Sequence, residues 1–262
     1  MTKKIRAGLW GFGRAGKAVA GELLAHQDFD LQWVIKKHPP RTIRYASQAF
    51  HREEDKAPVY CEKDLSSDFY KNFPVDIIID FSDAGSYKRY AEAVQSGIKI
   101  ISAISNLSEP ALATLKLHAQ HTAILYSPNI TVGINFLMIA SSLFQKIVPH
   151  ADIEIVEEHF REKEDTSGTA LKIAKSLGLD NHKHVNSIRV GGIVGKHEVI
   201  FGLKNQTIRL VHESINKAAF GQGAIFAAKW LIDQPAGFYT MEEILMERMR
   251  QQLSLMETHV AT

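Results

Sequence analysis

Short apolar runs and helical segments alternate through the first half of the chain. Five apolar runs predict strands, at residues 5–10, 31–35, 75–81, 98–102 and 123–126. The run VDIIIDF at 75–81 is almost continuously apolar, as expected of a central parallel strand covered on both faces. Three segments with helical periodicity lie between the strands, at residues 15–26, 87–96 and 109–120, and Ser108 is placed to cap the last of them. This alternation predicts βαβ units and a doubly wound parallel α/β sheet, whereas the polar stretch 36–61 gives no clear pattern.

The pattern changes after Ser127-Pro128-Asn129. A long apolar helix is expected at 134–147, and four strand-like runs follow with few helices between them, at residues 152–158, 187–190, 198–202 and 207–212. This is an α+β pattern, which predicts a mixed or antiparallel sheet. Helical sequence returns at 224–233 and 241–253. We therefore expect a first domain over residues 1–129, to which residues 218–262 return, and a second domain over residues 130–217.

Composition and charge narrow the class of protein. Hydrophobic residues make up 45% of the 262 residues, enough for a sizeable core, and the formal net charge of +2 gives no support to nucleic-acid binding. Cys61 is the only cysteine, which predicts no intrachain disulfide and fits a reducing compartment. The short basic start has no signal-peptide pattern, and no apolar run is long enough to span a membrane. We expect a cytoplasmic globular protein that binds neither nucleic acid nor membrane.

A glycine-rich motif follows the first predicted strand and opens the first predicted helix. It reads G-x-G-x-x-G at Gly11, Gly13 and Gly16, and its strand–turn–helix context makes it far more specific than the pattern alone. In a dinucleotide site the first glycine allows a tight turn, the second admits the pyrophosphate, and the third lets the helix pack closely on the strand. The cofactor-binding candidates in this loop are Gly11, Phe12, Gly13, Arg14, Ala15 and Gly16.

The end of the second predicted strand bears on the choice of cofactor. NAD sites usually carry an acidic residue there, which bonds the ribose 2′-hydroxyl group. This chain has Lys36 and Lys37 instead, with Arg41 and Arg44 beyond them, and Arg14 in the loop is a further candidate contact. Because lysines attract a 2′-phosphate and a carboxylate would repel it, we expect NADPH to be preferred over NADH. The alternative is that the two lysines form a solvated strand end.

The densest group of chemically active residues lies at 157–170, in the second predicted domain. A strand leads into a loop that carries His159 and Lys163, and Ser167-Gly168-Thr169 then starts a helix. An imidazole and an ammonium group four residues apart offer a proton donor and a cationic anchor. Free amides at a helix start suit a carboxylate or phosphate. From the spacing alone, a charged surface loop with Ser167 as the helix cap fits about as well as a site.

The segment 157–170 resembles the signature of the 4-hydroxy-tetrahydrodipicolinate reductase (dihydrodipicolinate reductase) family, which reads roughly E-x-H-H-x-x-K-x-D-x-P-S-G-T-A. The likeness extends over nearly the whole chain. Besides the glycine loop it includes IDFS at 79–82, SPNITVGIN at 127–135, RVGGIVGKHEVIFG at 189–202, AAKWL at 227–231 and GFYTMEEIL at 237–245. Several motifs in the same order are much more specific than any one of them.

The resemblance implies a function and roles for individual residues. The fold would be a Rossmann domain plus an α+β domain for substrate binding and tetramer assembly. The reaction would be hydride transfer from NADPH, or less well from NADH, to a cyclic dicarboxylate in lysine and diaminopimelate biosynthesis. His159 would be the general acid and Lys163 a substrate-binding lysine that supports proton transfer, and Ser167, Gly168 and Thr169 would cradle a substrate carboxylate. The matching motifs imply further cofactor contacts at Phe81, Ser82, Ala103, Ser105, Ser127 and Asn129.

Three positions depart from the family pattern. Phe160 stands where the family has a second histidine at the substrate site, and the proline before Ser167 is absent. The family's G-T-T-G near the nicotinamide corresponds to residues 103–106, which include Ile104. These changes leave two alternatives open: an NADP-dependent oxidoreductase of the same fold acting on another imino or amino acid, and a non-catalytic NADPH-binding protein. The remaining histidines lack the spacing of metal ligands, so we expect no metal site.

Overall fold

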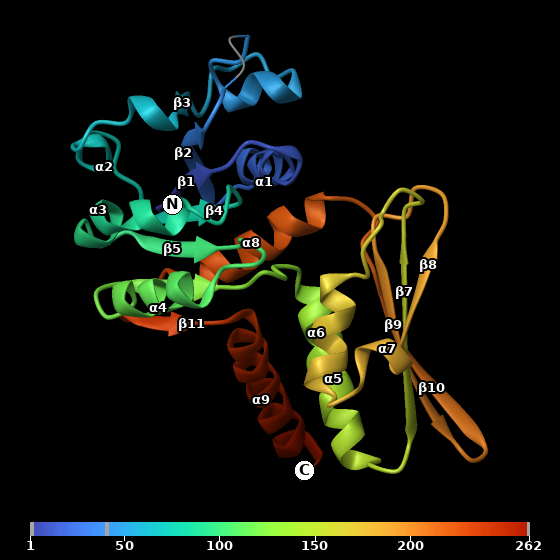
Figure 1. Cartoon of the computed structure of the whole chain (residues 1–262). Helices are drawn as coiled ribbons and strands as arrows, with labels where there is room; N and C mark the ends of the chain where they lie inside the picture. The colour runs from blue at the N-terminus through green and yellow to red at the C-terminus, as the bar shows by residue number, and fades with distance from the viewer. Residues whose placement is uncertain (1–2, 40–41, 261–262) are drawn as a thin grey trace. The chain divides into compact units, whose positions relative to one another are not determined.

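The chain divides into two compact units. The computed structural model describes residues 3–39 and 42–260 (Figure 1). Unit 1 runs up to Ile130 and includes Phe220–Ile244, and unit 2 comprises Thr131–Ala219 and the chain from Leu245 onward. Residues 1, 2, 261 and 262, which the predicted domain bounds include, lie outside the described residues, as does Arg41.

Unit 1 is built on a seven-stranded parallel sheet in the order β11-β6-β5-β4-β1-β2-β3 (Figure 1). The doubly wound α/β fold predicted from the sequence is thereby confirmed. All four residues of β4 are buried, as expected of a strand that has neighbours on both sides and lies in a sheet covered on both faces. The strands are β1 (Ile5–Trp10), β2 (Phe29–Lys36), β3 (Val59–Cys61), β4 (Ile77–Asp80), β5 (Lys99–Ser102), β6 (Ala123–Tyr126) and β11 (Gly237–Tyr239).

The predicted helices of unit 1 are present in the predicted order, but one is shorter than expected, and the short helix Phe69–Asn72 was not predicted. Ser108 caps α4, since its Oγ accepts a hydrogen bond of 3.4 Å from the amide of Ala111. The helix expected at 87–96 is shorter: a 3-10 turn covers Ser86–Arg89, and only Tyr90–Gln95 is α-helical. The helices are α1 (Arg14–Ala25), α2 (Phe69–Asn72), α3 (Tyr90–Gln95), α4 (Glu109–His118) and α8 (Ala218–Leu231), while α9 (Met241–Val260) begins in unit 1 and ends in unit 2.

Unit 2 contains the predicted mixed sheet, with four strands in the order β10-β9-β7-β8 (Figure 1). β9 is antiparallel to β7 and β10, whereas β8 is parallel to β7. The elements of this unit are α5 (Val132–Ile147), β7 (Asp152–His159), α6 (Gly168–Ser176), α7 (Asn181–His184), β8 (Val185–Arg189), β9 (Lys196–Leu203) and β10 (Gln206–Glu213).

The two faces of the unit 2 sheet differ. Exposure alternates along β7, and its inward residues pack with β9 against α5 and α6 in one apolar cluster that includes Ile134, Ile155, Ile173 and Phe201. Burying each such side chain contributes roughly 1.5–3 kcal/mol to stability. Toward the carboxyl end of β7 the same inward face becomes polar, with Glu157 and His159. The apolar part of the sheet therefore supports a polar cluster at one end.

Candidate active site

The glycine loop of unit 1 lies where the strand order of the sheet reverses. β1 and β4 are neighbours, and the chain winds outward from them in opposite directions, which is the usual place for a ligand in an open α/β sheet. Gly11 follows β1 with a φ of 93°, and a Cβ there would lie 2.5 Å from the carbonyl oxygen of Phe81. Only glycine can make this turn so close to the end of β4.

The other two glycines also have the properties that a dinucleotide loop needs. A Cβ at Gly16 would lie 2.1 Å from the carbonyl oxygen of Gly11, so this position must be glycine for α1 to approach β1. Gly13 is exposed, and a Cβ there would meet nothing within 4 Å, which leaves its backbone open to a ligand. Arg14 is exposed and Ala15 half-buried, while Phe12 is buried. The open backbone at the start of α1 fits a pyrophosphate group.

The two lysines at the end of β2 have different surroundings. Lys36 is half-buried, and its Nζ donates a hydrogen bond of 3.3 Å to the carbonyl oxygen of Phe12 in the glycine loop. Lys37 is exposed, with its Nζ 4.0 Å from a carboxylate oxygen of Asp83. A cationic side chain thus stands beside the loop where NAD sites usually have an acid.

The remaining cofactor candidates follow the carboxyl ends of β4, β5 and β6. They are Phe81, Ser82, Ala103, Ser105, Ser127 and Asn129. Because these strands are parallel and adjacent, their carboxyl ends share one edge of the sheet with the glycine loop. Ser127 donates a hydrogen bond of 2.7 Å to the carbonyl of Asn129, which shapes the turn after β6.

Asp80 supports this edge and was not singled out from the sequence. It is fully buried at the end of β4, and it accepts hydrogen bonds from the amide and hydroxyl of Ser82 and from the hydroxyl of Tyr90. Burial raises the pKa of Asp80 above its ordinary value, although these donors oppose the shift. The signal in the sequence is an acid within the apolar run VDIIIDF. Asp80 fixes the position of Ser82, a candidate cofactor contact.

In unit 2 the candidate site is organised around the carboxylate of Glu157, which is completely buried. It accepts hydrogen bonds from His159, Ser167, Ser187 and both terminal nitrogens of Arg189. Burial opposes ionisation of Glu157, but the donors, led by Arg189, outweigh it and lower its pKa to about 2. At neutral pH this carboxylate is therefore a fixed negative charge.

Glu157 holds the candidate general acid. The Nδ1 of His159 lies 2.5 Å from Oε2 of Glu157, which sets the ring orientation and the proton on Nδ1. The Nε2 is then the nitrogen that can exchange a proton with a ligand. A Cβ at Gly195 would lie 3.0 Å from this Nε2, so the glycine leaves space next to it. His159 is 8% exposed, which limits its access to solvent.

Arg189 also fixes the loop that carries Lys163. Its guanidinium donates hydrogen bonds of 2.8 and 2.9 Å to the carbonyl oxygens of Lys163 and Asp165. Lys163 is half-buried, and its amide donates to the carbonyl of Phe160. The loop backbone is thus held by the same arginine that neutralises Glu157.

The predicted carboxylate cradle begins α6, as expected from the sequence. Ser167 is its N-cap, with its Oγ accepting from the amide of Ala170 at 3.5 Å. Gly168 is exposed, and a Cβ there would meet nothing within 4 Å, so there is room for a ligand at the helix start; Thr169 is half-buried. The amide of Ser167 donates to Glu157, which joins the cradle to His159.

His197 belongs to this cluster, although the sequence reading gave it no role. It lies in β9 directly opposite Glu157, and its Nε2 is 2.8 Å from Oγ of Ser167. Burial, together with the neighbouring His159 and His212, lowers the pKa of His197 to about 4. The sequence separation of 30 residues between Ser167 and His197 hides the contact, and only the register of β7 and β9 brings them together.

Phe160 lies beyond the end of β7, and its side chain is 40% exposed, in contrast to the buried His159 before it.

Within the described ranges, no group of three histidine, cysteine, aspartate or glutamate residues has an arrangement suited to a metal ion. In the same part of the chain no helix has both the length and the apolar character that crossing a membrane requires.

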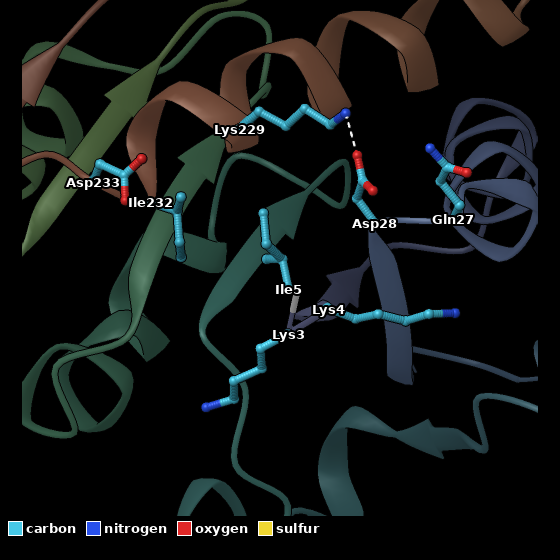
Figure 2. Close-up of a pocket in the computed structure, with 8 residues that line it drawn as sticks. All are labelled: Lys3, Lys4, Ile5, Gln27, Asp28, Lys229, Ile232 and Asp233. Atoms are coloured by element: carbon cyan, nitrogen blue, oxygen red, sulfur yellow. Dashed lines mark hydrogen bonds and ion pairs between the residues drawn. The ribbon is translucent and has the colours of Figure 1, made fainter. Parts of the chain in front are cut away.

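Unit 1 has a separate pocket at the amino end of β1, whereas the glycine loop follows the carboxyl end of that strand. Figure 2 shows the residues that line the pocket. They are Lys3, Lys4, Ile5, Gln27, Asp28, Lys229, Ile232 and Asp233. The Nζ of Lys229 is 2.6 Å from a carboxylate oxygen of Asp28, so this lysine is already paired. The pocket contains none of the candidate site residues.

Two family models and several curated relatives match this chain. A family model described as the N-terminus of dihydrodipicolinate reductase matches residues 5–130, and one described as its C-terminus matches residues 133–245. The 4-hydroxy-tetrahydrodipicolinate reductase of Caldanaerobacter subterraneus subsp. tengcongensis is 34% identical over 192 residues, which cover 65% of this chain and 76% of the relative. That of Pseudoalteromonas translucida is 33% identical over 196 residues, or 65% of this chain and 73% of the relative.

Solved structures support the same fold. The dipicolinate-bound dihydrodipicolinate reductase from Paenisporosarcina sp. TG-14 superposes with a TM-score of 0.75 at 19% identity, covering 92% of this chain and 99% of that one. An amine dehydrogenase from Mycobacterium smegmatis, at 11% identity, has a TM-score of 0.63 over 92% of this chain and 96% of its own. From the two family models and the relatives above 30% identity, the chain belongs to the dihydrodipicolinate reductase family.

Proposed function

We propose that this protein reduces 4-hydroxy-tetrahydrodipicolinate to tetrahydrodipicolinate, a step of lysine and diaminopimelate biosynthesis, with NADPH as the preferred cofactor and NADH as a weaker one. The observation that carries the proposal is the link from Glu157 to both His159 and Ser167. One buried carboxylate positions a proton donor and the start of a helix suited to a substrate carboxylate. Membership of the reductase family supports the same reaction.

The residues of unit 1 supply the cofactor site in this proposal. Backbone groups at Gly11, Gly13 and the start of α1 would hold the pyrophosphate, and Lys36 and Lys37 would face the 2′-phosphate. Phe81, Ser82, Ala103, Ser105, Ser127 and Asn129 would line the rest of the nucleotide site. The nicotinamide, when bound, supplies the hydride, and residues of the protein bind the substrate and supply a proton.

The residues of unit 2 bind the substrate and supply a proton. Lys163 would attract the dianionic substrate, and Ser167, Gly168 and Thr169 would hold one of its carboxylates at the start of α6. With a proton on each ring nitrogen, His159 would give the one on Nε2 to the ring carbon next to the carbon that receives the hydride. This proton would replace the one lost when the 4-hydroxyl group leaves as water. The carboxylate of Glu157 would stabilise the ring orientation throughout the transfer, because Nδ1 stays bonded to it.

We also propose that the protein is a homotetramer assembled through the unit 2 sheet. The face of that sheet opposite the apolar cluster carries Glu158, and Ile188 lies directly beside Glu158 in the register of β7 and β8. Ile188 and Val211 on the sheet are 44% and 52% exposed, and Val190, which follows β8, is 44% exposed. A cytoplasmic location is consistent with the free thiol of Cys61.

A second candidate function is reduction of a different cyclic imine by the same fold. It is favoured by Phe160, which replaces an imidazole at the family's substrate site with an apolar ring. Loss of a hydrogen-bond partner for a charged group costs about 1–3 kcal/mol. The two candidates differ in the effect of Phe160→His: it should strengthen binding of pyridine-2,6-dicarboxylate if the family substrate is used, and leave that binding unchanged while damaging the native activity if another imine is used.

The proposed roles of His159 and Lys163 are tested by steady-state kinetics with NADPH and freshly generated 4-hydroxy-tetrahydrodipicolinate. A general acid contributes about 10²–10⁴-fold to the rate, so His159→Ala should lower kcat by that factor with NADPH affinity unchanged. Lys163→Ala should also raise the substrate KM, because it removes a cation that binds an anion. Lys175→Ala, at an exposed lysine of α6, is the matched control and should behave as the natural protein. Unchanged turnover in both His159→Ala and Lys163→Ala would place the chemistry elsewhere.

A further inference from the structure

The hydroxyl of Ser167 has more partners than a helix cap needs. Its Oγ accepts a long hydrogen bond of 3.5 Å from Ala170 and lies 2.8 Å from Nε2 of His197. The amide of the same residue is bonded to Glu157. Ser108, which caps α4 in unit 1, accepts the corresponding hydrogen bond from the amide of Ala111 at 3.4 Å. The contact between Ser167 and His197 is therefore not needed to cap α6 and calls for another explanation.

The direction of the Ser167–His197 hydrogen bond decides what the hydroxyl can do. A hydroxyl has one proton and two lone pairs, and the amide of Ala170 occupies one lone pair. If His197 donates from Nε2, it fills the second lone pair and leaves the hydroxyl proton available to a ligand. If His197 accepts at Nε2, the hydroxyl proton is used within the protein.

The surroundings of His197 favour the first arrangement. The residue is 6% exposed, and its Nδ1 is buried with no hydrogen-bond partner among the described residues. Because its pKa is lowered to about 4, His197 carries a single ring proton at neutral pH. If Nε2 accepted, that proton would sit on Nδ1 as a buried donor without an acceptor, and such orphaned N–H groups are rare in proteins. With the proton on Nε2, the unpaired Nδ1 carries only a lone pair, and the N–H donor at Nε2 bonds to Oγ of Ser167.

We propose that His197 is a positioning residue: it donates from Nε2 to Oγ of Ser167, so that Ser167 presents its hydroxyl proton to an anionic carboxylate at the start of α6. The ligand then receives that hydroxyl together with the exposed backbone at Gly168. The inference rests on the proposed function, in which this helix start binds a substrate carboxylate. It adds a residue of β9 to the binding machinery, and it assigns His197 no part in proton transfer to the substrate.

The tautomer is tested directly on the natural protein without any substrate. Nitrogen-15 NMR of the ¹⁵N-histidine-labelled full chain at pH 7, assigned by comparison with His197→Gln, distinguishes protonated Nε2 from protonated Nδ1. We expect His197 to be neutral with its proton on Nε2. A proton on Nδ1 would overturn the proposal whatever the reaction of the enzyme is.

Two neutral substitutions separate positioning from packing. The amide nitrogen of Gln reaches approximately the place of Nε2, whereas that of Asn reaches only the place of Nδ1. We expect His197→Asn to weaken binding of pyridine-2,6-dicarboxylate about tenfold, to the level of Ser167→Ala, and His197→Gln to stay within about threefold of the natural protein. In steady state His197→Asn should raise KM by a similar factor with kcat nearly unchanged. A role in packing alone would affect Gln and Asn alike.

Calorimetry with NADPH present measures these affinities, and Ser108→Ala is the control for loss of a helix cap far from the site in sequence. In the Ser167→Ala background His197→Asn should have no further effect, because the hydroxyl it positions is gone. Equal binding by the natural protein and both His197 variants, or additive losses in the double variant, would overturn the inference. If the natural protein neither binds the dicarboxylate nor oxidises NADPH with the substrate, the proposed function is contradicted instead, and the NMR measurement still decides the tautomer.

Discussion

Lys36 and Lys37 are adjacent in sequence but differ in what they contact. Lys36 is tied to the carbonyl of Phe12, so its ammonium group stays beside the glycine loop, whereas Lys37 is exposed and only weakly paired with Asp83. A charge-assisted hydrogen bond to phosphate is worth about 1.5–3 kcal/mol, whereas an exposed ion pair contributes about 0–1 kcal/mol. If these lysines bind the 2′-phosphate, the protein should therefore bind NADPH measurably more tightly than NADH.

We predict that the protein binds NADPH at least about fivefold more tightly than NADH, and that Lys36→Glu or Lys37→Glu weakens NADPH selectively. Fluorescence titration of both cofactors measures this preference. Lys71→Glu, at an exposed lysine of α2, makes the same change of charge away from β2 and should leave the ratio unaltered. A preference below about fivefold in the natural protein would remove the claim that these lysines recognise the 2′-phosphate.

At the scale of strands and loops, Arg189 joins β8 to β7 and to the loop after β7. It bonds the carboxylate of Glu157 and two carbonyls of the loop, and both charged groups are largely buried. Arg209 and Glu198 form a second cross-strand pair in the same sheet, but the arginine there is 57% exposed. Removing one member of a buried pair leaves an uncompensated charge, whereas an exposed pair contributes little.

We predict that Arg189→Leu lowers the free energy of unfolding at pH 7 by about 3–5 kcal/mol and that Arg209→Leu lowers it by about 1 kcal/mol or less. Because the pKa of Glu157 is about 2 when folded and ordinarily near 4.5, its stabilisation is complete above pH 4.5 and is lost as the pH falls toward 2. The difference between the natural protein and Arg189→Leu should shrink over that range. Urea denaturation at several pH values measures both effects, and equal costs of the two substitutions at pH 7 would refute the account.

The elements predicted correctly from sequence are those with a strong local pattern. The strand Ala123–Tyr126 has the predicted bounds, and the cap at Ser108 holds, because both depend on nearby residues. β3 and β11 were not predicted, since each has only three residues and is a strand only by pairing at an edge of the sheet. The helix expected at 87–96 is α-helical only over Tyr90–Gln95, and a 3-10 turn at Ser86–Arg89 precedes it.

The candidate site was only partly accessible to sequence reasoning. His159, Lys163 and Ser167 lie within nine residues of one another, so their grouping shows in a single motif. Arg189 and His197 complete the cluster from β8 and β9, and their contacts depend on the pairing of those strands with β7. Which residues of β8 and β9 lie opposite Glu157 depends on the pairing of strands that are far apart in the sequence, and no local motif specifies it.

At the scale of the whole molecule, the face of the unit 2 sheet opposite its apolar cluster carries apolar side chains that are exposed among the described residues. The ion pairs of Glu158 with Lys196 and of Glu198 with Arg209 lie across this face, beside the exposed Ile188 and Val211. Apolar side chains interleaved with ion pairs are suited to a symmetric contact between copies, in which the same patch meets itself. The tetramer we propose would bury these residues.

We predict that Ile188→Asp or Val211→Asp converts a tetramer to smaller species, because either change places a charge in the proposed interface. Light scattering coupled to gel filtration gives the mass of each protein. Leu117→Asp changes a residue of α4 that is 61% exposed and should leave the mass unchanged. A natural protein that is monomeric at micromolar concentration would rule out the assembly.

The proposed reduction requires hydride transfer from the cofactor to a carbon of the substrate ring, and isotope transfer follows that event directly. NADPH with deuterium at both C4 positions is incubated with the protein and freshly generated 4-hydroxy-tetrahydrodipicolinate, and the product is examined by mass spectrometry. We expect substrate-dependent oxidation of NADPH and tetrahydrodipicolinate carrying one deuterium for each cofactor oxidised. Binding of NADPH with no oxidation, or a product without deuterium, would contradict the proposed reduction.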